Sequence, residues 1–241
     1  MTPVGGQSQR TGRDFENNER VARDMGDGDW TILANGDWPS KDAVIAACSG
    51  SKNVIACDGA LETCNSIGVV PTVVVGDLDS ASSASVVAFA QQGGLVHRDE
   101  SQNCNDLEKA LEYAKEQGAT SCTVFGATGG DVQHEWANLS ACGAAGFDIT
   151  CLAPKATFRF FRTGKKYSIE MAAGQTFSLF ALGEAKGITL QGAKFSLDDA
   201  SLAFGSQGVH NIAQASQVEL VYSSGRLMMV HPVFSSPEGG V

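Results

Sequence analysis

Acidic side chains directly follow apolar runs that are typical of buried strands. Asp58 comes after one such run, the pair Asp77 and Asp79 comes after the next, and Asp106 follows a shorter one. Alternate residues of an extended segment point to the same side, so the Asp-x-Asp pair presents two carboxylates to one cleft. Mg²⁺ prefers such oxygen ligands and shares them with substrate phosphates. An aspartate after a strand is also a common turn former or helix cap, but its recurrence favours a metal-dependent phosphate site.

A glycine-rich segment, Gly126–Gly130, lies between an apolar run and the start of a predicted helix. The backbone N–H groups of such a loop can face phosphate oxygens, helped by the helix N-terminus. The segment matches neither a dinucleotide-binding fingerprint nor a Walker loop, and a tight strand-to-helix turn explains the glycines equally well. His134 follows the loop, and no arrangement of Ser, His and Asp or of Cys and His indicates covalent catalysis.

The elements that must position these side chains alternate between short apolar runs and amphipathic stretches. This alternation predicts an α/β domain over residues 30–155, with a parallel, Rossmann-like sheet covered by helices on both faces. In such a sheet the chemistry gathers at the carboxyl ends of the strands. The predicted strands are 30–35, 53–57, 72–75, 95–96, 122–125 and 148–152, and the predicted helices are 41–48, 60–67, 82–92, 106–117 and 135–145.

The pattern changes after residue 155, where short apolar or alternating segments are separated by glycines. Residues 156–233 are predicted to form a small all-β domain, a sandwich or barrel, with a possible turn at Leu197–Ala203. Residues 1–29 and 234–241 carry little apolar periodicity and are expected to be tails.

Composition limits the functional classes. The 241 residues are 43% hydrophobic, which is enough for a core and excludes a disordered chain. No apolar run approaches the roughly 18 residues of a membrane helix, and no apolar signal core begins the chain. Seven scattered cysteines without a Cys-x-x-Cys pair indicate reduced thiols in the cytoplasm. A net charge of −10 argues against nucleic acid as a partner and suits a site built from carboxylates.

Several motifs occur in the order and spacing of the thiamine pyrophosphokinase family, which the chain resembles from about Thr31 to Pro232. In the first part they are Leu33–Gly36, Cys57–Ala60, Gly76–Ser80, Gln102–Leu111 and Gly126–Gly130 with His134 and Asn138. In the second part they are Gly187–Gly192 and Phe195–Leu197. Gly-Asp-x-Asp-Ser with a later Asn-Asp-x-x-Lys-Ala carries most of the specificity.

The resemblance implies a fold, a reaction and partners. The α/β domain would be catalytic and the β-sandwich domain would bind thiamine. The enzyme would transfer pyrophosphate from ATP to the hydroxyl group of thiamine, with Mg²⁺, and release AMP. It would work as a homodimer with its active sites between subunits. Metal and hydrogen-bond donors would neutralise charge while the alcohol is held in line.

The resemblance also assigns roles to residues of this sequence. The catalytic carboxylates would be Asp58, Asp77, Asp79 and Asp106, and the metal ligands would be Asp77, Asp79 and Asn103. Nucleotide binding would fall to Gly36, Gly76, Ser80, Asn105, Gly126, Thr128 and His134. Substrate binding would fall to Gln102, His210 and Asn211.

Four positions differ from the pattern of the family. Asn103 stands where a metal-binding carboxylate is usual, Asp131 and Gln133 replace an arginine and an acid, and His210 replaces a serine. An amide oxygen can ligate without charge, and an aspartate near polyphosphate repels it unless a second metal intervenes. These differences leave two alternatives open, a pyrophosphokinase of the same fold with another acceptor and a catalytically weak protein that binds nucleotide or thiamine.

Overall fold

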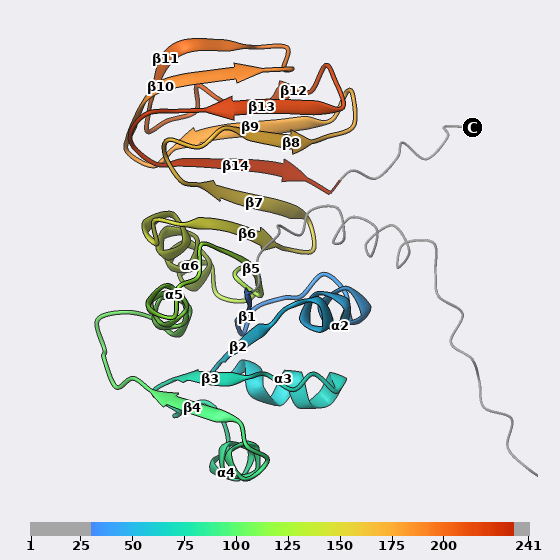
Figure 1. Cartoon of the computed structure of the whole chain (residues 1–241), viewed down its shortest axis with the longest axis vertical. Coiled ribbons are helices and arrows are strands. Elements are labelled where there is room, and N and C mark those ends of the chain that lie inside the picture. The colour runs from blue at the N-terminus through green and yellow to red at the C-terminus, as the bar shows by residue number, and fades with distance from the viewer. Residues whose placement is uncertain (1–29, 234–241) are drawn as a thin grey trace, which may run out of the picture.

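Strands and helices alternate through residues 30–152 of the computed structural model, which describes residues 30–233. The elements are β1 (Trp30–Leu33), α2 (Lys41–Gly50), β2 (Asn53–Cys57), α3 (Ala60–Ile67), β3 (Val73–Gly76), α4 (Ser83–Gln91), β4 (Leu95–Arg98), α5 (Asp106–Glu116), β5 (Ser121–Phe125), α6 (Val132–Ala144) and β6 (Asp148–Leu152). These six strands pair in parallel in the order β6-β5-β1-β2-β3-β4 (Figure 1). The predicted parallel sheet is confirmed, and we call this part the α/β half.

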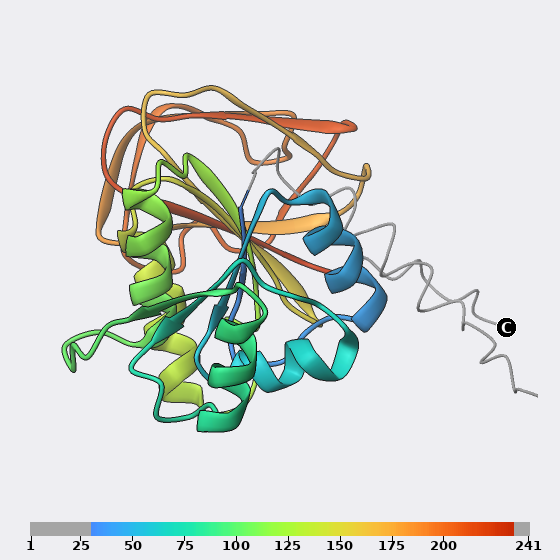
Figure 2. The same ribbon diagram turned by 60° about the horizontal axis from the view of Figure 1, so that its bottom comes forward.

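Helices cover both faces of this parallel sheet, α5 and α6 on one face and α2, α3 and α4 on the other (Figure 2). Neighbouring residues of β1 show how the strand serves both faces. Ile32 packs with Leu107 of α5, whereas Leu33 packs with Val44 of α2 and Leu61 of α3. Because successive side chains of a strand point to opposite faces, an unbroken apolar strand is the pattern that two helical layers require.

Residues 156–233 form the β half, whose strands are β7 (Ala156–Phe161), β8 (Tyr167–Glu170), β9 (Thr176–Ala181), β10 (Glu184–Gln191), β11 (Leu197–Ala203), β12 (Asn211–Ile212), β13 (Gln217–Val221) and β14 (Leu227–Pro232). One sheet has the order β11-β10-β13-β8. It packs on the layer that contains β9 and β14 through a core that includes Phe177, Ile188, Leu220 and Met229. The predicted β-sandwich is therefore confirmed.

The two halves share one sheet. β7 pairs with β6 in antiparallel register, from Ile149 opposite Phe160 to Leu152 opposite Thr157, and β14, β9 and β12 extend the sheet to ten strands (Figure 1). The antiparallel connection needs only the short turn between β6 and β7, since antiparallel neighbours can be joined by a hairpin. The change from parallel to antiparallel pairing thus falls at the position where the sequence pattern changes.

One expected element is different in the structure. Leu197–Ala203, which the sequence suggests as a turn, is strand β11 at the edge of the four-stranded sheet. Only one of its seven residues, Leu202, is both apolar and buried, because an edge strand with one solvent face needs few buried side chains. The predicted tails 1–29 and 234–241 lie outside the described residues. Within residues 30–233, no helix combines the length and the apolar character needed to cross a membrane.

Candidate active site

A buried carboxylate fastens the acidic loop that follows β3. Asp58, directly after β2, is fully buried, and its two carboxylate oxygens accept the backbone N–H groups of Ser80 at 2.8 Å and Ala81 at 2.9 Å. Glu62 of α3 accepts the next N–H group, that of Ser82, at 2.8 Å. Hydrogen bonds to a charged acceptor are stronger than those between neutral groups. The residues after β2 therefore fix the path of the loop that carries the Asp-x-Asp pair.

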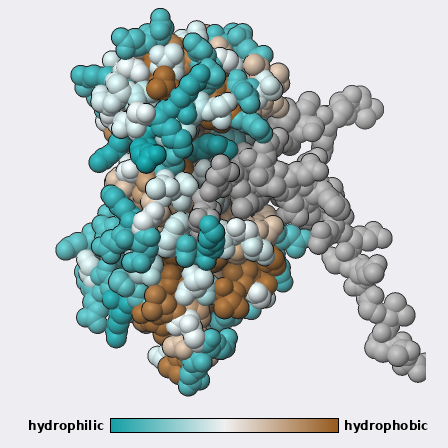
Figure 3. Space-filling view, viewed as in Figure 1, coloured by the Kyte–Doolittle hydropathy of each residue, from teal (hydrophilic) through white to brown (hydrophobic). Residues whose placement is uncertain are grey.

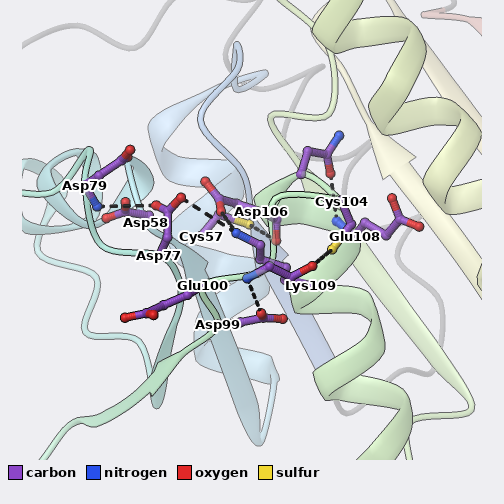
Figure 4. Close-up of polar contacts among 12 residues, drawn as sticks. Cys57, Asp58, Asp77, Asp79, Asp99, Glu100, Cys104, Asp106, Glu108 and Lys109 are labelled. Carbon is purple, nitrogen blue, oxygen red and sulfur yellow. Dashed lines mark hydrogen bonds and ion pairs between the residues drawn. The ribbon is translucent and has the colours of Figure 1, made fainter.

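The loop itself brings Asp77 and Asp79 to Asp58. Leu78 between them has a positive φ of 66°, a conformation that costs a residue with a branched side chain free energy. Its side chain packs against the core beneath α3 and α4, which holds it in place. Carboxylate oxygens of Asp58, Asp77 and Asp79 lie within 4.8 Å of one another (Figure 4). We call these three residues the acidic trio.

Lys109 connects the acidic trio to α5. Its Nζ atom lies 3.3 Å from Asp106 Oδ1 and 3.9 Å from Asp77 Oδ2, and its side chain is only 3% exposed (Figure 4). Asp106 and Lys109 meet because residues three apart share a face of a helix. Gly76 leaves room for this approach, since a Cβ atom there would lie 2.7 Å from Asp58 Cβ. The lysine thus holds two carboxylates from different elements.

The charges of these groups shift their pKa values in different directions. Burial raises the pKa of Asp106, although Lys109 opposes the shift. For Asp77 burial acts in the same direction, but the backbone N–H of Asp79 together with Lys109 and Gln102 outweighs it and lowers the pKa. Burial tends to lower the pKa of Lys109, whereas its bonds to Asp106 and Asp77 raise it. Asp77 and Lys109 are therefore ionised at neutral pH.

A cavity of about 420 Å³ opens beside the acidic trio at the carboxyl edge of the parallel strands. Its walls come from the loop after β1, the loops after β2 and β3, the start of α5 and the start of α6. The lining residues are Ala34, Asn35, Gly36, Cys57, Gly59, Asp77, Ser80, Ser101, Gln102, Cys104, Asn105, Asp106, Leu107, Lys109, Gly129, Gly130, Asp131, His134 and Asn138. This location is where α/β sheets bind ligands.

The glycine-rich loop is fastened to the loop after β1. Gly36 donates its N–H to Gly126 O at 3.0 Å and Asp37 donates to Thr128 O at 2.7 Å. A Cβ atom on Gly36 would lie 2.2 Å from Thr128 O, so the close approach requires glycine. Asn138 of α6 donates its amide to Ala127 O at 3.0 Å. These bonds position the loop as one wall of the cavity.

Most of the sequence-predicted site residues meet at this cavity. Gly36, Asp77, Ser80, Gln102, Asn105, Asp106 and His134 line it, and Asp58 and Asp79 belong to the acidic trio beside it. Gly76 packs against Asp58 and Asp106, while Gly126 and Thr128 support the cavity wall through their carbonyl groups. Asn103 is exposed and is not among the lining residues.

His210 and Asn211 lie in the β half and do not line the cavity. His210 has a positive φ of 59°, and its N–H donates to Ser178 Oγ at 3.2 Å. Asn211 is buried, and its side chain accepts the N–H groups of Phe195 and Ile212 and donates to Phe195 O. Within one chain, Asn211 therefore holds a turn of the β half.

Sequence reasoning missed Lys109 as a site residue, although its motif was recognised. The signal was available, because a lysine three residues after an aspartate on a predicted helix is positioned to pair with it. Asn138 was likewise recognised only as part of a motif, yet it lines the cavity and accepts the amide of Asn105 at 3.0 Å. No pattern along the chain indicated that Cys57 and Cys104 would reach the same cavity.

The acidic trio has the donor chemistry of a site for a hard divalent cation. It offers carboxylate oxygens only, at a mutual distance that one ion can span, beside a polar cavity. Both oxygens of Asp58 already accept one backbone N–H each, and each keeps a further lone pair. The residues present thus fit Mg²⁺.

Fold and site together define an α/β phosphotransferase with an appended β-sandwich. Two family models match the chain, "Thiamin pyrophosphokinase, catalytic domain" over residues 46–149 and "Thiamin pyrophosphokinase, vitamin B1 binding domain" over residues 166–227. The chain belongs to the thiamine pyrophosphokinase family, and its enzymatic function is that of a thiamine diphosphokinase. Among curated proteins, no sequence match is found.

Solved structures of thiamine pyrophosphokinases have a similar fold. The structure from Bacillus subtilis is 21% identical, with 84% of this chain and 98% of that chain covered and a TM-score of 0.70. The structure from Geobacillus thermodenitrificans is 24% identical, with 86% and 98% covered and a TM-score of 0.70. The yeast structure is 12% identical, with 89% of each chain covered and a TM-score of 0.62. At these identities the likeness supports the fold.

Proposed function

We propose that the cavity binds ATP and thiamine and that the acidic trio holds the Mg²⁺ needed to transfer pyrophosphate between them. The observation that carries this proposal is the convergence of Asp58, Asp77 and Asp79 within 4.8 Å beside a cavity of about 420 Å³. When bound, the ion neutralises charge on the polyphosphate and orients it. The reaction forms a bond between the thiamine hydroxyl oxygen and the β-phosphorus of ATP and breaks the bond from that phosphorus to the oxygen that bridges the α- and β-phosphates. AMP leaves with the bridging oxygen, and the hydroxyl proton is released to solvent.

The side chains of the chain contribute mainly by positioning. Asp77 and Asp79 would face the metal, while Asp58 holds their loop through the N–H groups of Ser80 and Ala81. Lys109 keeps the carboxylates of Asp77 and Asp106 at fixed separation. Such preorganisation lowers the reorganisation needed when charge develops in the transition state. Gln102, whose amide lies 3.4 Å from Asp77 Oδ2, closes the same wall.

We further propose that two copies of the chain complete the site. His210 and Asn211 lie away from the cavity of their own chain, and the same turn region exposes Phe204 (68%) and Val209 (38%). A second copy would bring this region to the thiamine end of the cavity. Mixing Asp77→Asn with His210→Ala chains then restores part of the activity that each lacks, whereas chains that act alone give no gain.

The proposed reaction is tested by AMP release from ATP and Mg²⁺, with and without thiamine. We expect AMP and thiamine diphosphate in equal amounts, and neither when a chelator removes the metal. AMP formation that does not depend on thiamine would indicate that another acceptor, or water, takes the pyrophosphoryl group. Nucleotide binding without AMP would contradict the proposal and favour a protein that only binds its ligands.

A further inference from the structure

Two carboxylates at the start of α6, those of Asp131 and Glu135, accept backbone N–H groups beside the cavity. Asp131 is the N-cap, and its Oδ1 atom accepts the N–H groups of Gln133 at 2.8 Å and His134 at 3.3 Å. Glu135 Oε1 accepts the N–H of Gly129 in the glycine-rich loop at 2.7 Å. N–H groups at a helix N-terminus attract phosphate because they carry partial positive charge. At these three N–H groups, side-chain carboxylates of the chain itself take the place that a bound anion would occupy.

The loop that carries Gly129 has little freedom to exchange these partners. The carbonyl groups of Gly126 and Thr128 are held by the N–H groups of Gly36 and Asp37. A Cβ atom on Gly129 would lie 2.4 Å from Asp37 Cγ, so the loop is packed closely against the segment after β1. The glycine-rich loop is thus fastened on one side by backbone bonds and on the other by Glu135.

The charges around the cavity also oppose a bare polyphosphate. Asp77, Asp106 and Asp131 line it, and they come from three different elements. Among the described lining residues, Lys109 is the sole lysine or arginine, and it pairs with Asp106 and Asp77. Asp131 is exposed, so its repulsion of a bound phosphate is strongest at low ionic strength, whereas a bound divalent cation reverses the sign of the local interaction.

We propose that Asp131 makes this cavity selective for nucleotide that is already complexed with a divalent cation. The carboxylate takes the position at the α6 N-terminus where an anion would bind, and it raises the cost of placing uncomplexed phosphate there. Asp131 is therefore a specificity-determining residue for the nucleotide. This inference rests on the proposed function only in taking ATP as the ligand of the cavity.

The test compares ATP affinity with and without metal for the full chain. Isothermal titration calorimetry at low ionic strength is done in EDTA and in excess Mg²⁺, because salt screens the repulsion. Asp131→Asn and Asp131→Ser keep an uncharged N-cap, so α6 stays capped. Glu116→Gln removes the same charge from the exposed end of α5 and is the matched control.

We expect both Asp131 variants to bind metal-free ATP about tenfold more tightly than the unchanged chain, with a smaller change for the Mg²⁺ complex. Glu116→Gln should resemble the unchanged chain in both conditions. The inference is overturned if neither Asp131 variant gains affinity for metal-free ATP, or if the control gains as much.

Measuring thiamine-dependent AMP on the same preparations separates the two proposals. A gain in metal-free affinity without any AMP formation would support the role of Asp131 and count against the proposed reaction. AMP formation together with unchanged metal-free affinity would overturn the role of Asp131 alone.

Discussion

Each half of the molecule has a buried polar side chain that holds a neighbouring loop by hydrogen bonds to its backbone. In the α/β half, Asp58 accepts two backbone N–H groups, from Ser80 and Ala81. In the β half, Asn211 accepts the N–H of Phe195 at 3.0 Å and donates to its carbonyl oxygen at 2.8 Å. The amide satisfies a donor and an acceptor and carries no charge. The carboxylate leaves a negative charge that its N–H partners do not cancel.

The difference shows where the molecule places like charges close together, which costs electrostatic free energy. The α/β half gathers buried and half-buried carboxylates around one cavity and balances them with one lysine, Lys109. In the β half, the turn at Asn211 is held by a neutral amide. On the face seen in Figure 3, the larger apolar patches lie over the α/β half, while the β half is mostly hydrophilic. The carboxylates around the cavity thus gather in the region where a cation and phosphates are proposed to bind.

The largest effect is expected from removing charge at the acidic trio. Asp77→Asn should lower Mg²⁺-dependent AMP formation by about 100-fold or more, since it weakens electrostatic stabilisation of the transferred group. The thermal midpoint should stay nearly constant, because Asp77 is partly exposed. Steady-state kinetics and thermal unfolding measure the two effects. Asp198→Asn in the exposed part of β11 is the control, and a fully active Asp77→Asn would remove this residue from the site.

Asp58 and Asn211 should differ in how much each contributes to the free energy of unfolding. Asp58→Ala removes a charged acceptor from the N–H groups of Ser80 and buried Ala81 and should lower the free energy of unfolding by about 2–4 kcal/mol. Asn211→Ala removes neutral bonds and should cost about 1–3 kcal/mol. Urea unfolding followed by circular dichroism gives both values. If both variants lost the same free energy of unfolding, the charge of Asp58 would add nothing to the strength of its hydrogen bonds.

The smallest effect concerns alkaline pH. All seven cysteines lie in the α/β half, and burial raises the pKa of the Cys64 thiol from 9.0 to about 12. In the β half burial raises the pKa of Tyr222 from 10.0 to about 12. When folding raises the pKa of a group, the contribution of that group to stability is fully present below its pKa in the unfolded chain. This contribution is lost as the pH rises from there through its pKa in the folded chain. The Cys64 thiol should therefore lower the stability of the α/β half from about pH 9, by about 1.4 kcal/mol at pH 10.

All three tryptophans also lie in the α/β half, so their fluorescence during urea unfolding reports this effect. Between pH 8 and pH 10, Cys64→Ala should lose less stability than the unchanged chain. Tyr222→Phe should lose as much as the unchanged chain over this range. An identical pH dependence in Cys64→Ala would show that the thiol does not contribute.

The order of elements in the α/β half could be predicted because apolar runs and helix caps are local signals. The convergence of Asp58, Asp77 and Asp106 could also be predicted, since parallel strands end at one edge. The polar strand β11 could not, because its sequence resembles a turn and only its partner β10 makes it a strand. Pairing between β6 and β7 is local, since residues 153–155 alone separate the strands, but the apolar pattern does not reveal that this pairing joins both halves into one sheet.

The site shows the same limit. The sequence predicts helix α6 from residue 135, whereas the helix begins at Val132, and Asp131 is its N-cap with a side chain that accepts the N–H groups of Gln133 and His134. The family resemblance suggests Asn211 as a substrate-binding residue, whereas its bonds to Phe195 depend on how the β half folds. Local pattern predicts which residues can do chemistry, and tertiary packing decides which bonds they make.

The shared sheet has a consequence for how substrates move in and out. Rotating the β half against the α/β half as rigid bodies would break the β6–β7 ladder, from Ile149 opposite Phe160 to Leu152 opposite Thr157. Hinge closure between domains needs a flexible link that absorbs large dihedral changes, and a continuous ladder offers none. Entry to and exit from the cavity therefore take place without rotation of one half against the other, and the sheet keeps the cavity edge and the β half in a fixed relation.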